Sequence, residues 1–283
     1  MNLLVLPFPQ IDPVALSVGP VEVRWYGLAY FVGILIGWWY ARRLVRNGRL
    51  WQGGSAPISI VDLDDFVLWG TLGIILGGRL GYAMFYEPGH YIDDPMAFLR
   101  LWEGGMSFHG GLTGIVVAMI AFSLKRGFNA LSLFDVIAAA VPFGLFFGRL
   151  ANFINGELYG RIAYVPWAMV FPNGGPLPRH PSQLYEAALE GLLMFLILRL
   201  LTHHFRSLRM PGLTGGTFLA LYGCFRIFAE FFRQPDPQLG FIASFLTMGM
   251  ILSVPMILIG LGGVFWALAH RRRDEGQDEG QGA

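Results

Sequence analysis

The sequence predicts an all-α polytopic membrane protein with about seven transmembrane helices and a small cap on its outer face. Three observations support this fold class. Hydrophobic residues make up 54% of the 283-residue chain and charged residues only 14%, against roughly 25% charged residues in a soluble domain. Several apolar stretches have about the 20-residue length that a membrane-spanning helix needs. Lysine and arginine are concentrated in alternate connections between these stretches, as the positive-inside rule requires.

The apolar stretches follow one another along the chain and predict the spans in order. Interrupting glycine and proline residues are tolerated in membrane helices where neighbouring helices supply packing. The predicted spans cover residues 23–41, 66–86, 106–123, 134–153, 185–201, 213–232 and 242–268.

The basic residues give these spans an orientation. The connection EPGHYIDDPMAFLRLWEGG, residues 87–105, contains a single arginine and several acidic residues, so we place it outside. The N-terminus is then outside and the C-terminus is cytoplasmic. The excess of positive charge lies in the inner connections, at Arg42, Arg43, Arg46, Arg49, Lys125, Arg126, Arg206, Arg209 and Arg271–Arg273.

We assign residues 1–270 to one transmembrane domain with an outer insertion. The connection at 154–184 contains the turn sequences PNGG and PLP, and it is too long for a simple loop in a compact domain. We therefore expect it to form a small folded cap. The polar, glycine-rich end RRRDEGQDEGQGA, residues 271–283, predicts a disordered cytoplasmic tail.

Three arginines, Arg79, Arg149 and Arg226, lie inside predicted spans, where charged groups are costly and usually face a polar cavity. Their spans all run from inside to outside. At about 1.5 Å per residue, all three lie roughly 6–10 Å below the outer boundary. Further polar residues occupy this level and predict one wall of a cavity that opens to the outer leaflet: Tyr26, His109, Asn152, Glu157, Arg161 and Glu230.

Each of these residues also has a structural interpretation, and the sequence leaves these alternatives open. An arginine near a helix end can extend to the interface without any chemical role. Asn152 and Asn155 can cap and end a helix. His109 can be a packed histidine, and Tyr26 can belong to an aromatic belt. The occurrence of all of them at one depth favours a common site.

Arginine side chains at the level of lipid headgroups suggest a phospholipid ligand, because the guanidinium group matches phosphate oxygens. A nearby histidine can accept a proton near neutral pH. Together they could support a displacement at a phospholipid. The sequence has no HExxH, GxSxG or phosphate-loop motif, and we expect neither a metal nor a cofactor. We interpret the acidic run DLDD, residues 62–65, as a solvated helix start.

Four segments resemble the bacterial prolipoprotein diacylglyceryl transferases. They are GRLANFINGELYGR (148–161), GGMSFHGG (104–111), RHPSQLYEA (179–187) and YGCFRIFAEFFRQPD (222–236). The resemblance implies that phosphatidylglycerol donates its diacylglyceryl group to a cysteine thiol of a prolipoprotein. A thioether forms and glycerol 1-phosphate leaves. It also implies an inner-membrane enzyme that acts at the periplasmic leaflet on the lipobox segment of the signal peptide.

The resemblance assigns roles to individual residues. His109 matches the histidine proposed as the base, with Tyr26 or water as open alternatives. Arg149 matches an arginine assigned to phosphatidylglycerol binding. Arg226 matches a second essential arginine, which Glu230 would orient. Further functionally important positions are matched by Tyr26, Asn152, Glu157 and Gly160.

Other function classes fit the sequence less well. A phospholipid translocator or proton-coupled transporter also uses intramembrane charges, but it should carry them at mid-membrane or on both sides. A metal-dependent phosphatidyltransferase would need an acidic cluster, and a scaffold would not need converging arginines. A nucleic-acid partner is not expected, because the formal net charge is only +1.

Overall fold

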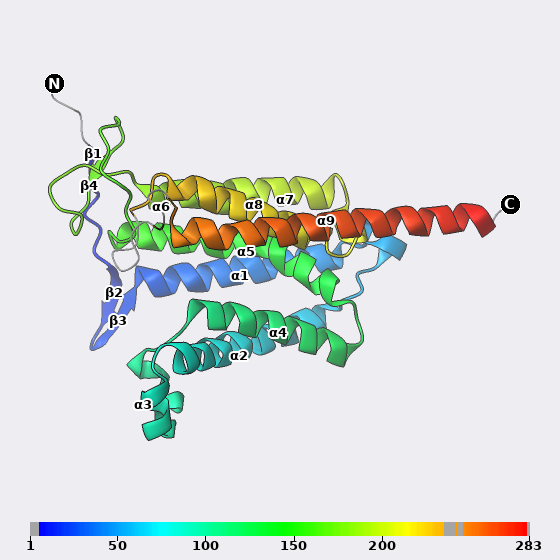
Figure 1. The fold of residues 1–283 in the computed structure, drawn as a ribbon, viewed down its shortest axis with the longest axis horizontal. Coiled ribbons are helices and arrows are strands. Elements are labelled where there is room, and N and C mark those ends of the chain that lie inside the picture. Colours follow the sequence, from blue (N-terminus) through cyan, green and yellow to red (C-terminus); the bar gives the residue numbers. More distant parts are fainter. Residues whose placement is uncertain (1–5, 235–241, 243–245, 282–283) are drawn as a thin grey trace.

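A computed structural model describes residues 6–234, 242 and 246–281 of the chain. Most of the described chain is helical, as the sequence predicts. Long helices cover each predicted span (Figure 1). They are α1 Trp25–Arg46, α2 Ile60–Phe85, α4 Phe108–Arg126, α5 Ala130–Ile154, the run of α6 Ser182–Glu186, π-helix η5 Ala187–Leu193 and α7 Met194–His203, then α8 Leu213–Glu230 and α9 Met248–Gln281.

By length and composition alone, three helices of the described residues can cross a membrane. They are Phe108–Arg126, Ala130–Ile154 and the part of α9 at Met248–His270. These apolar helices make the chain an integral membrane protein. The count of seven spans and their orientation stay predictions.

The last helix differs from its prediction at both ends. Residues 243–245 of the predicted seventh span lie outside the described residues, and α9 begins at Met248. Its backbone stays helical as far as Gln281, where the sequence predicts a disordered tail. A helix that has already formed extends at little cost, and this segment contains arginine, glutamate and glutamine, which favour helices. Residues 282–283 lie outside the described part.

Four short strands, which the all-α prediction misses, lie at one end of the molecule. β1 Leu6–Pro7 pairs in parallel with β4 Met169–Val170, and β2 Val14–Val18 pairs antiparallel with β3 Val21–Arg24. Figure 1 shows them together with the chain that follows α5, and we call this the strand end. β3 leads directly into α1, so the strands fix where the first long helix begins.

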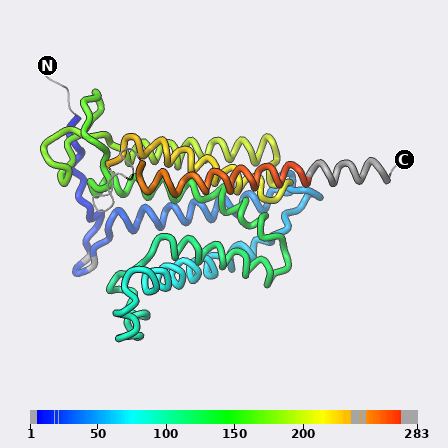
Figure 2. Tube along the Cα trace, viewed as in Figure 1, coloured from blue at the N-terminus to red at the C-terminus, as the bar shows by residue number. Residues whose placement is uncertain are grey.

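The opposite end, which we call the core end, holds the main apolar cluster. It joins the last turns of α1 and α4 to the first turns of α2 and α5, and it includes Tyr40, Leu44, Leu63, Phe66, Phe122, Leu133 and Val136. Apolar burial contributes roughly 25 cal/mol per Å², so this cluster anchors the four helices to one another. The tube in Figure 2 shows the chain turning at this end between α1 and α2, between α4 and α5, and between α7 and α8.

The helices α2 and α4 form a close pair. At Gly81, an added Cβ would lie 2.8 Å from the Cα of Gly110, and at Gly73 it would lie 2.7 Å from the carbonyl oxygen of Gly114. Glycines at these positions let two helix backbones approach closely, which is the usual basis of helix association in lipid. In Figure 1 the pair lies beside α1 and α5 as a separate layer.

Local sequence signals explain where the helices begin. Ser59 and Asp62 form a capping box at the start of α2. The acidic run at 62–65 therefore lies in the first turns of a helix, as the sequence predicts. Asp64 accepts from Trp38 at 2.8 Å and from Arg42 at 2.7 Å, which ties α2 to α1 at the core end. Shorter helical turns occupy connections: Gly48–Leu50, Gln52–Gly54, Pro88–Asp93 (α3), Pro95–Leu99, Leu101–Glu103 and Ser207–Arg209.

Candidate active site

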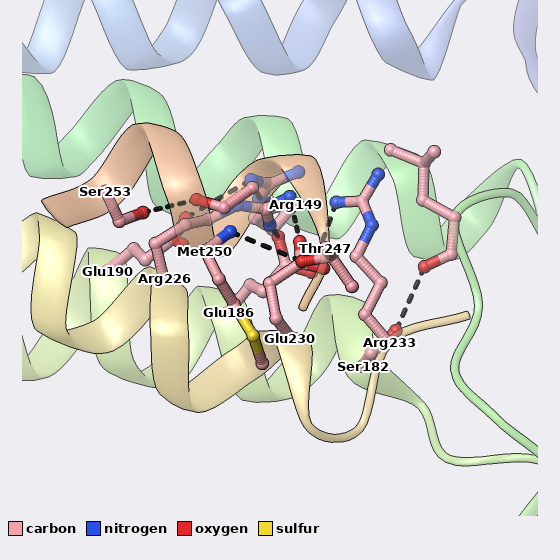
Figure 3. A network of polar contacts seen from close by, with 12 residues as sticks. Arg149, Ser182, Glu186, Glu190, Arg226, Glu230, Arg233, Thr247, Met250 and Ser253 are labelled. Atoms are coloured by element: carbon pink, nitrogen blue, oxygen red, sulfur yellow. Dashed lines mark hydrogen bonds and ion pairs between the residues drawn. The ribbon is translucent and has the colours of Figure 1, made fainter. Parts of the chain in front are cut away.

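Three arginines from separate parts of the chain converge on one buried carboxylate, Glu186 at the end of α6. Its Oε2 lies 2.7 Å from Arg149 of α5 and 3.3 Å from Arg226 of α8. Its Oε1 lies 3.5 Å from Arg233, which follows α8. Figure 3 shows these side chains pointing toward one another from the surrounding helices. Glu186 therefore links three arginines that are up to 84 positions apart in the sequence, from residue 149 to residue 233.

Two further carboxylates complete this group, which we call the arginine–glutamate cluster. Glu190, one turn after Glu186, lies 3.3 Å from Arg149. Glu230 lies 2.5 Å from Arg226 on the same helix face. The three arginines and three glutamates have no formal net charge. Such pairing is required because an isolated buried charge is very costly.

Burial differs between the two kinds of side chain. Glu186 and Glu190 are 1% and 0% exposed, whereas Arg149, Arg226 and Arg233 are 17%, 16% and 20% exposed. The acids hold the arginines from within the protein. Each guanidinium has five N–H donors, so its exposed side can donate to an anion while its buried side stays paired.

The helix that carries the acids offers more acceptors than the arginines use. One side-chain oxygen of Gln183 and one of Glu190 are buried without a hydrogen-bond partner among the described residues, and Oε1 of Glu186 has the 3.5 Å ion pair with Arg233 but no hydrogen bond. These residues recur at intervals of three and four, so they share one face of the helix. A buried acceptor without a donor lowers the free energy of unfolding. We therefore infer that this helix face serves a function rather than stability.

A second polar group lies where α5 ends. The Asn152 side chain donates to Glu157 at 2.8 Å, and the Gln183 side chain donates to the carbonyl of Glu157 at 2.6 Å. Tyr26, at the start of α1, is exposed, and its hydroxyl lies 3.2 Å from that of Tyr30. Leu158 has φ of +56°, a strained value for a leucine, and its carbonyl accepts from Ser182 at 3.0 Å. The turn after α5 is therefore held in one conformation.

Gly160 lies where two segments cross. Its N–H donates to the carbonyl of His180 at 2.8 Å. An added Cβ would lie 2.7 Å from that same carbonyl oxygen, so no other residue fits without displacement. The next residue, Arg161, donates to the carbonyls of Glu230 and Arg233, each at 2.9 Å. This crossing fastens the turn after α5 to the end of α8, where the cluster lies.

His180, whose carbonyl accepts from Gly160, also takes part in a chain of side-chain hydrogen bonds. The indole N–H of Trp167 donates to the Tyr185 hydroxyl at 2.6 Å, and that hydroxyl lies 3.0 Å from Nδ1 of His180. Because the indole can only donate, the Tyr185 hydrogen is free to bond Nδ1. Burial lowers the pKa of His180, which favours this neutral arrangement.

An apolar cavity of about 550 Å³ lies between the α2–α4 pair and α1 and α5. Its lining along α5 runs from Ile137 to Asn152, a length of roughly 22 Å at 1.5 Å per residue. Half the hydrocarbon core of a bilayer is about 15 Å thick, so the cavity can hold an extended acyl chain. Arg149, Asn152 and Tyr222 make one end of it polar.

The structure brings together several residues that the sequence singles out. Arg149, Arg226 and Glu230 are in the cluster, and Asn152 lines the same cavity as Arg149. Glu157 and Gly160 belong to the adjoining turn at the strand end, and Tyr26 lies at the start of α1, which follows β3. The sequence-predicted layer therefore contains one compact polar group.

Two predicted residues lie apart from this group. Arg79 is not part of the cluster, because backbone carbonyls of residues 97–105 surround its guanidinium. The prediction of three arginines on one cavity wall is therefore wrong for Arg79. His109 lies exposed in the first turn of α4, beside Phe108, which lines the cavity. No hydrogen bond or ion pair among the described residues joins His109 to the cluster.

Sequence reasoning missed four residues of the site: Glu186, Glu190, Tyr222 and Arg233. The first two lie four residues apart in an apolar span, which is itself a signal for a functional acid pair. Arg233 directly follows the predicted sixth span. Cys224, which the sequence places inside an apolar run, is exposed on α8 and takes no part in the site.

A sequence model of one protein family, described as prolipoprotein diacylglyceryl transferase, matches residues 13–266. The chain belongs to the prolipoprotein diacylglyceryl transferase family. A relative from Sinorhizobium medicae is 57% identical over 272 residues, which is 96% of each chain. A relative from Nitrobacter winogradskyi is 57% identical over 284 residues, covering 99% of this chain and 97% of its own. Both relatives are named phosphatidylglycerol–prolipoprotein diacylglyceryl transferase.

The part of the chain that matches the prolipoprotein diacylglyceryl transferase family includes the whole site. The matched region contains every residue of the arginine–glutamate cluster and the cavity lining. It also contains the turn at Gly160 and the start of α4 at His109.

Proposed function

We propose that this protein transfers the diacylglyceryl group of phosphatidylglycerol to the cysteine thiol of prolipoproteins, forming a thioether and releasing glycerol 1-phosphate. The observation that carries the proposal is the arginine–glutamate cluster at the polar end of a long apolar cavity, in a member of this family. Phosphatidylglycerol has a phosphate diester attached to two acyl chains. The exposed sides of Arg149 and Arg226 can donate hydrogen bonds to the phosphate diester, and the cavity can hold an acyl chain.

The proposed reaction is a displacement at carbon. The thiol sulfur attacks the carbon of the diacylglyceryl group that bears the phosphate. A C–S bond forms, and the C–O bond breaks with its electrons passing to the phosphate oxygen, so that glycerol 1-phosphate leaves. The thiol proton passes to a base, because the thiolate is the attacking form. The guanidinium groups of Arg149 and Arg226 stabilise the charge that grows on the departing phosphate.

His109 is our candidate for the base, with Tyr26 or water as the alternatives. Its place beside Phe108 puts it near the cavity wall. Glu230 and Glu186 orient the arginines, and Asn152, Glu157 and Gly160 shape the turn that faces the headgroup. Each of these roles rests on the contacts described above together with the motif positions.

We further propose seven spans with the N-terminus outside and the C-terminus cytoplasmic, in the bacterial inner membrane. The basic residues of the inner connections, among them Arg46, Arg126 and Arg209, lie at the core end, and the positive-inside rule puts that end in the cytoplasm. The cluster then faces the periplasmic leaflet. There the lipobox segment of an exported precursor would reach it, with residues 154–184 receiving the signal peptide.

A phospholipid translocator is the alternative function. It would need a polar path through both halves of the membrane. The core end is closed by buried apolar side chains, including Leu63, Phe122 and Leu133. This one-sided arrangement favours an enzyme that takes substrates from the outer leaflet.

The test combines purified protein in phosphatidylglycerol nanodiscs with a lipobox peptide and measures glycerol phosphate release together with thioether formation by mass spectrometry. A peptide with serine in place of the cysteine is the substrate control, and R43K, at the core end, is the protein control. We expect R149K and R226K to lose at least about 100-fold in kcat/KM, because lysine cannot reproduce the guanidinium fork. Absence of glycerol phosphate release from the wild-type protein would refute the proposal.

A further inference from the structure

The Arg79 side chain is enclosed by the loop that precedes α4. It is 2% exposed, although it is charged and lies in α2. Its Nε and Nη atoms donate five hydrogen bonds to backbone carbonyls, which is all that a guanidinium has to give. The acceptors are the carbonyl oxygens of Ala97, Phe98, Arg100, Gly104 and Gly105.

The loop is shaped to present these carbonyls. Gly104 and Gly105 have φ values of +83° and +76°, a conformation that side chains disfavour. An added Cβ at Gly105 would lie 2.7 Å from Nη1 of Arg79 and 3.0 Å from the Tyr91 hydroxyl. Two successive glycines are therefore needed for the backbone to turn its oxygens toward the arginine.

The same anchor continues into the start of α4. The N–H of Ser107 donates to the carbonyl of Gly78 at 2.9 Å, next to Arg79 in α2. The Ser107 hydroxyl then accepts from Gly110 at 3.2 Å and caps α4. His109 is the second residue of that helix. Two adjacent residues of α2 thus fix the turn that sets the position of His109.

We propose that Arg79 is a positioning residue for His109: its guanidinium holds the loop at residues 97–105 and so fixes the first turn of α4, where His109 follows the cavity-lining Phe108. This inference rests on the proposed function, in which His109 takes the thiol proton. Arg79 itself touches neither substrate. Lysine cannot replace it, because an ammonium group has three donors and no planar fork.

The test is a double-mutant cycle with R79K and H109Q, measured with phosphatidylglycerol nanodiscs and a lipobox peptide. A misplacement of about 1 Å at a catalytic group can lower turnover by roughly 100-fold. We expect R79K to lower kcat by about 10- to 100-fold, with KM for phosphatidylglycerol changed by less than about threefold. In the H109Q background, R79K should add less than about twofold, because the residue that it positions is already absent.

G105A disturbs the same contact from the loop, because its methyl group would meet the Arg79 guanidinium. It should lower kcat and leave KM for phosphatidylglycerol nearly unchanged, as R79K should. V136A, in the apolar cluster at the core end, is the control for lost stability; it should lower the unfolding temperature and leave the kcat of the folded enzyme unchanged. Amide hydrogen exchange of residues 105–111 gives a second readout, and protection should fall in R79K and G105A but not in V136A.

Equal costs of R79K in the wild-type and H109Q backgrounds would overturn the proposal, as would unchanged amide protection in R79K. The exchange measurement decides the matter if H109Q turnover is too low to quantify. Failure of the wild-type protein to release glycerol phosphate is a separate result, since it would refute the proposed function and leave the anchoring of the loop measurable by exchange.

Discussion

Replacing Glu186 by glutamine removes the charge at the centre of the arginine–glutamate cluster and keeps the size of the side chain. The three arginines would then face two carboxylates, Glu190 and Glu230, and the cluster would hold one uncompensated positive charge. Breaking a buried ion pair in this way costs about 3–5 kcal/mol. We place E186Q in this range because Glu186 is 1% exposed and contacts all three arginines.

The assay is equilibrium unfolding in mixed micelles, accompanied by phosphatidylglycerol turnover. E22Q is the matched control, because Glu22 pairs with Arg24 where both side chains are more than half exposed, and exposed pairs contribute about 0–1 kcal/mol. The double variant E186L/R233L removes one charge of each sign and should regain part of the stability that E186Q loses. If E186Q is no less stable than E22Q, or if the double variant only adds the two single losses, the charge-balance reasoning is wrong.

Three further predictions concern the turn, the cavity and pH. G160A should lower stability by about 1–3 kcal/mol, because its methyl group would meet the His180 carbonyl; thermal unfolding measures this, and an unchanged midpoint would contradict the close crossing. G144L should raise KM for phosphatidylglycerol at least severalfold, because Gly144 lines the cavity and its Cβ would enter open space; L192A, at an exposed position of η5, is the control, and unaltered lipid kinetics in G144L would exclude the cavity as an acyl site. Burial lowers the pKa of His180, so the unfolded chain binds its proton more readily, and stability should fall as pH drops through about 6.5 toward the lowered folded value. H180Q should show a flatter stability profile between about pH 5 and pH 8, and identical slopes in the two proteins would refute this assignment.

The helices could be predicted from the sequence because their signals are local. Apolar stretches of sufficient length give the helical segments, and Ser59 with Asp62 marks the start of α2 as a capping box should. The short strands could not be predicted this way, since β1 pairs with β4 across more than 160 positions of sequence. Pairing at that separation depends on how the helices bring the ends together.

The sequence singles out Arg149, Arg226 and Glu230, which the structure brings together, but it does not identify their partners Glu186, Glu190 and Arg233. Arg149 and Arg79 both follow glycine in the sequence Gly-Arg-Leu, near the C-terminal ends of α5 and α2. One binds the carboxylates of Glu186 and Glu190, and the other binds a ring of backbone carbonyls. Sequence gives the position of each arginine along its helix, whereas the identity of its acceptor depends on which loop or helix folds against it.

The charge balance of the cluster explains how three largely buried arginines can be held together until substrate arrives. Three guanidinium groups without acids would repel one another and would face the full cost of leaving water. Three glutamates remove that cost, but they also cancel the net attraction for an anion. A phosphate must therefore be bound by short-range donation from the exposed sides of Arg149 and Arg226, in a geometry that Glu186 fixes beforehand. Because donation of this kind is strongest where negative charge is most concentrated, it favours the departing phosphate monoester over the bound diester, which is the direction that catalysis requires.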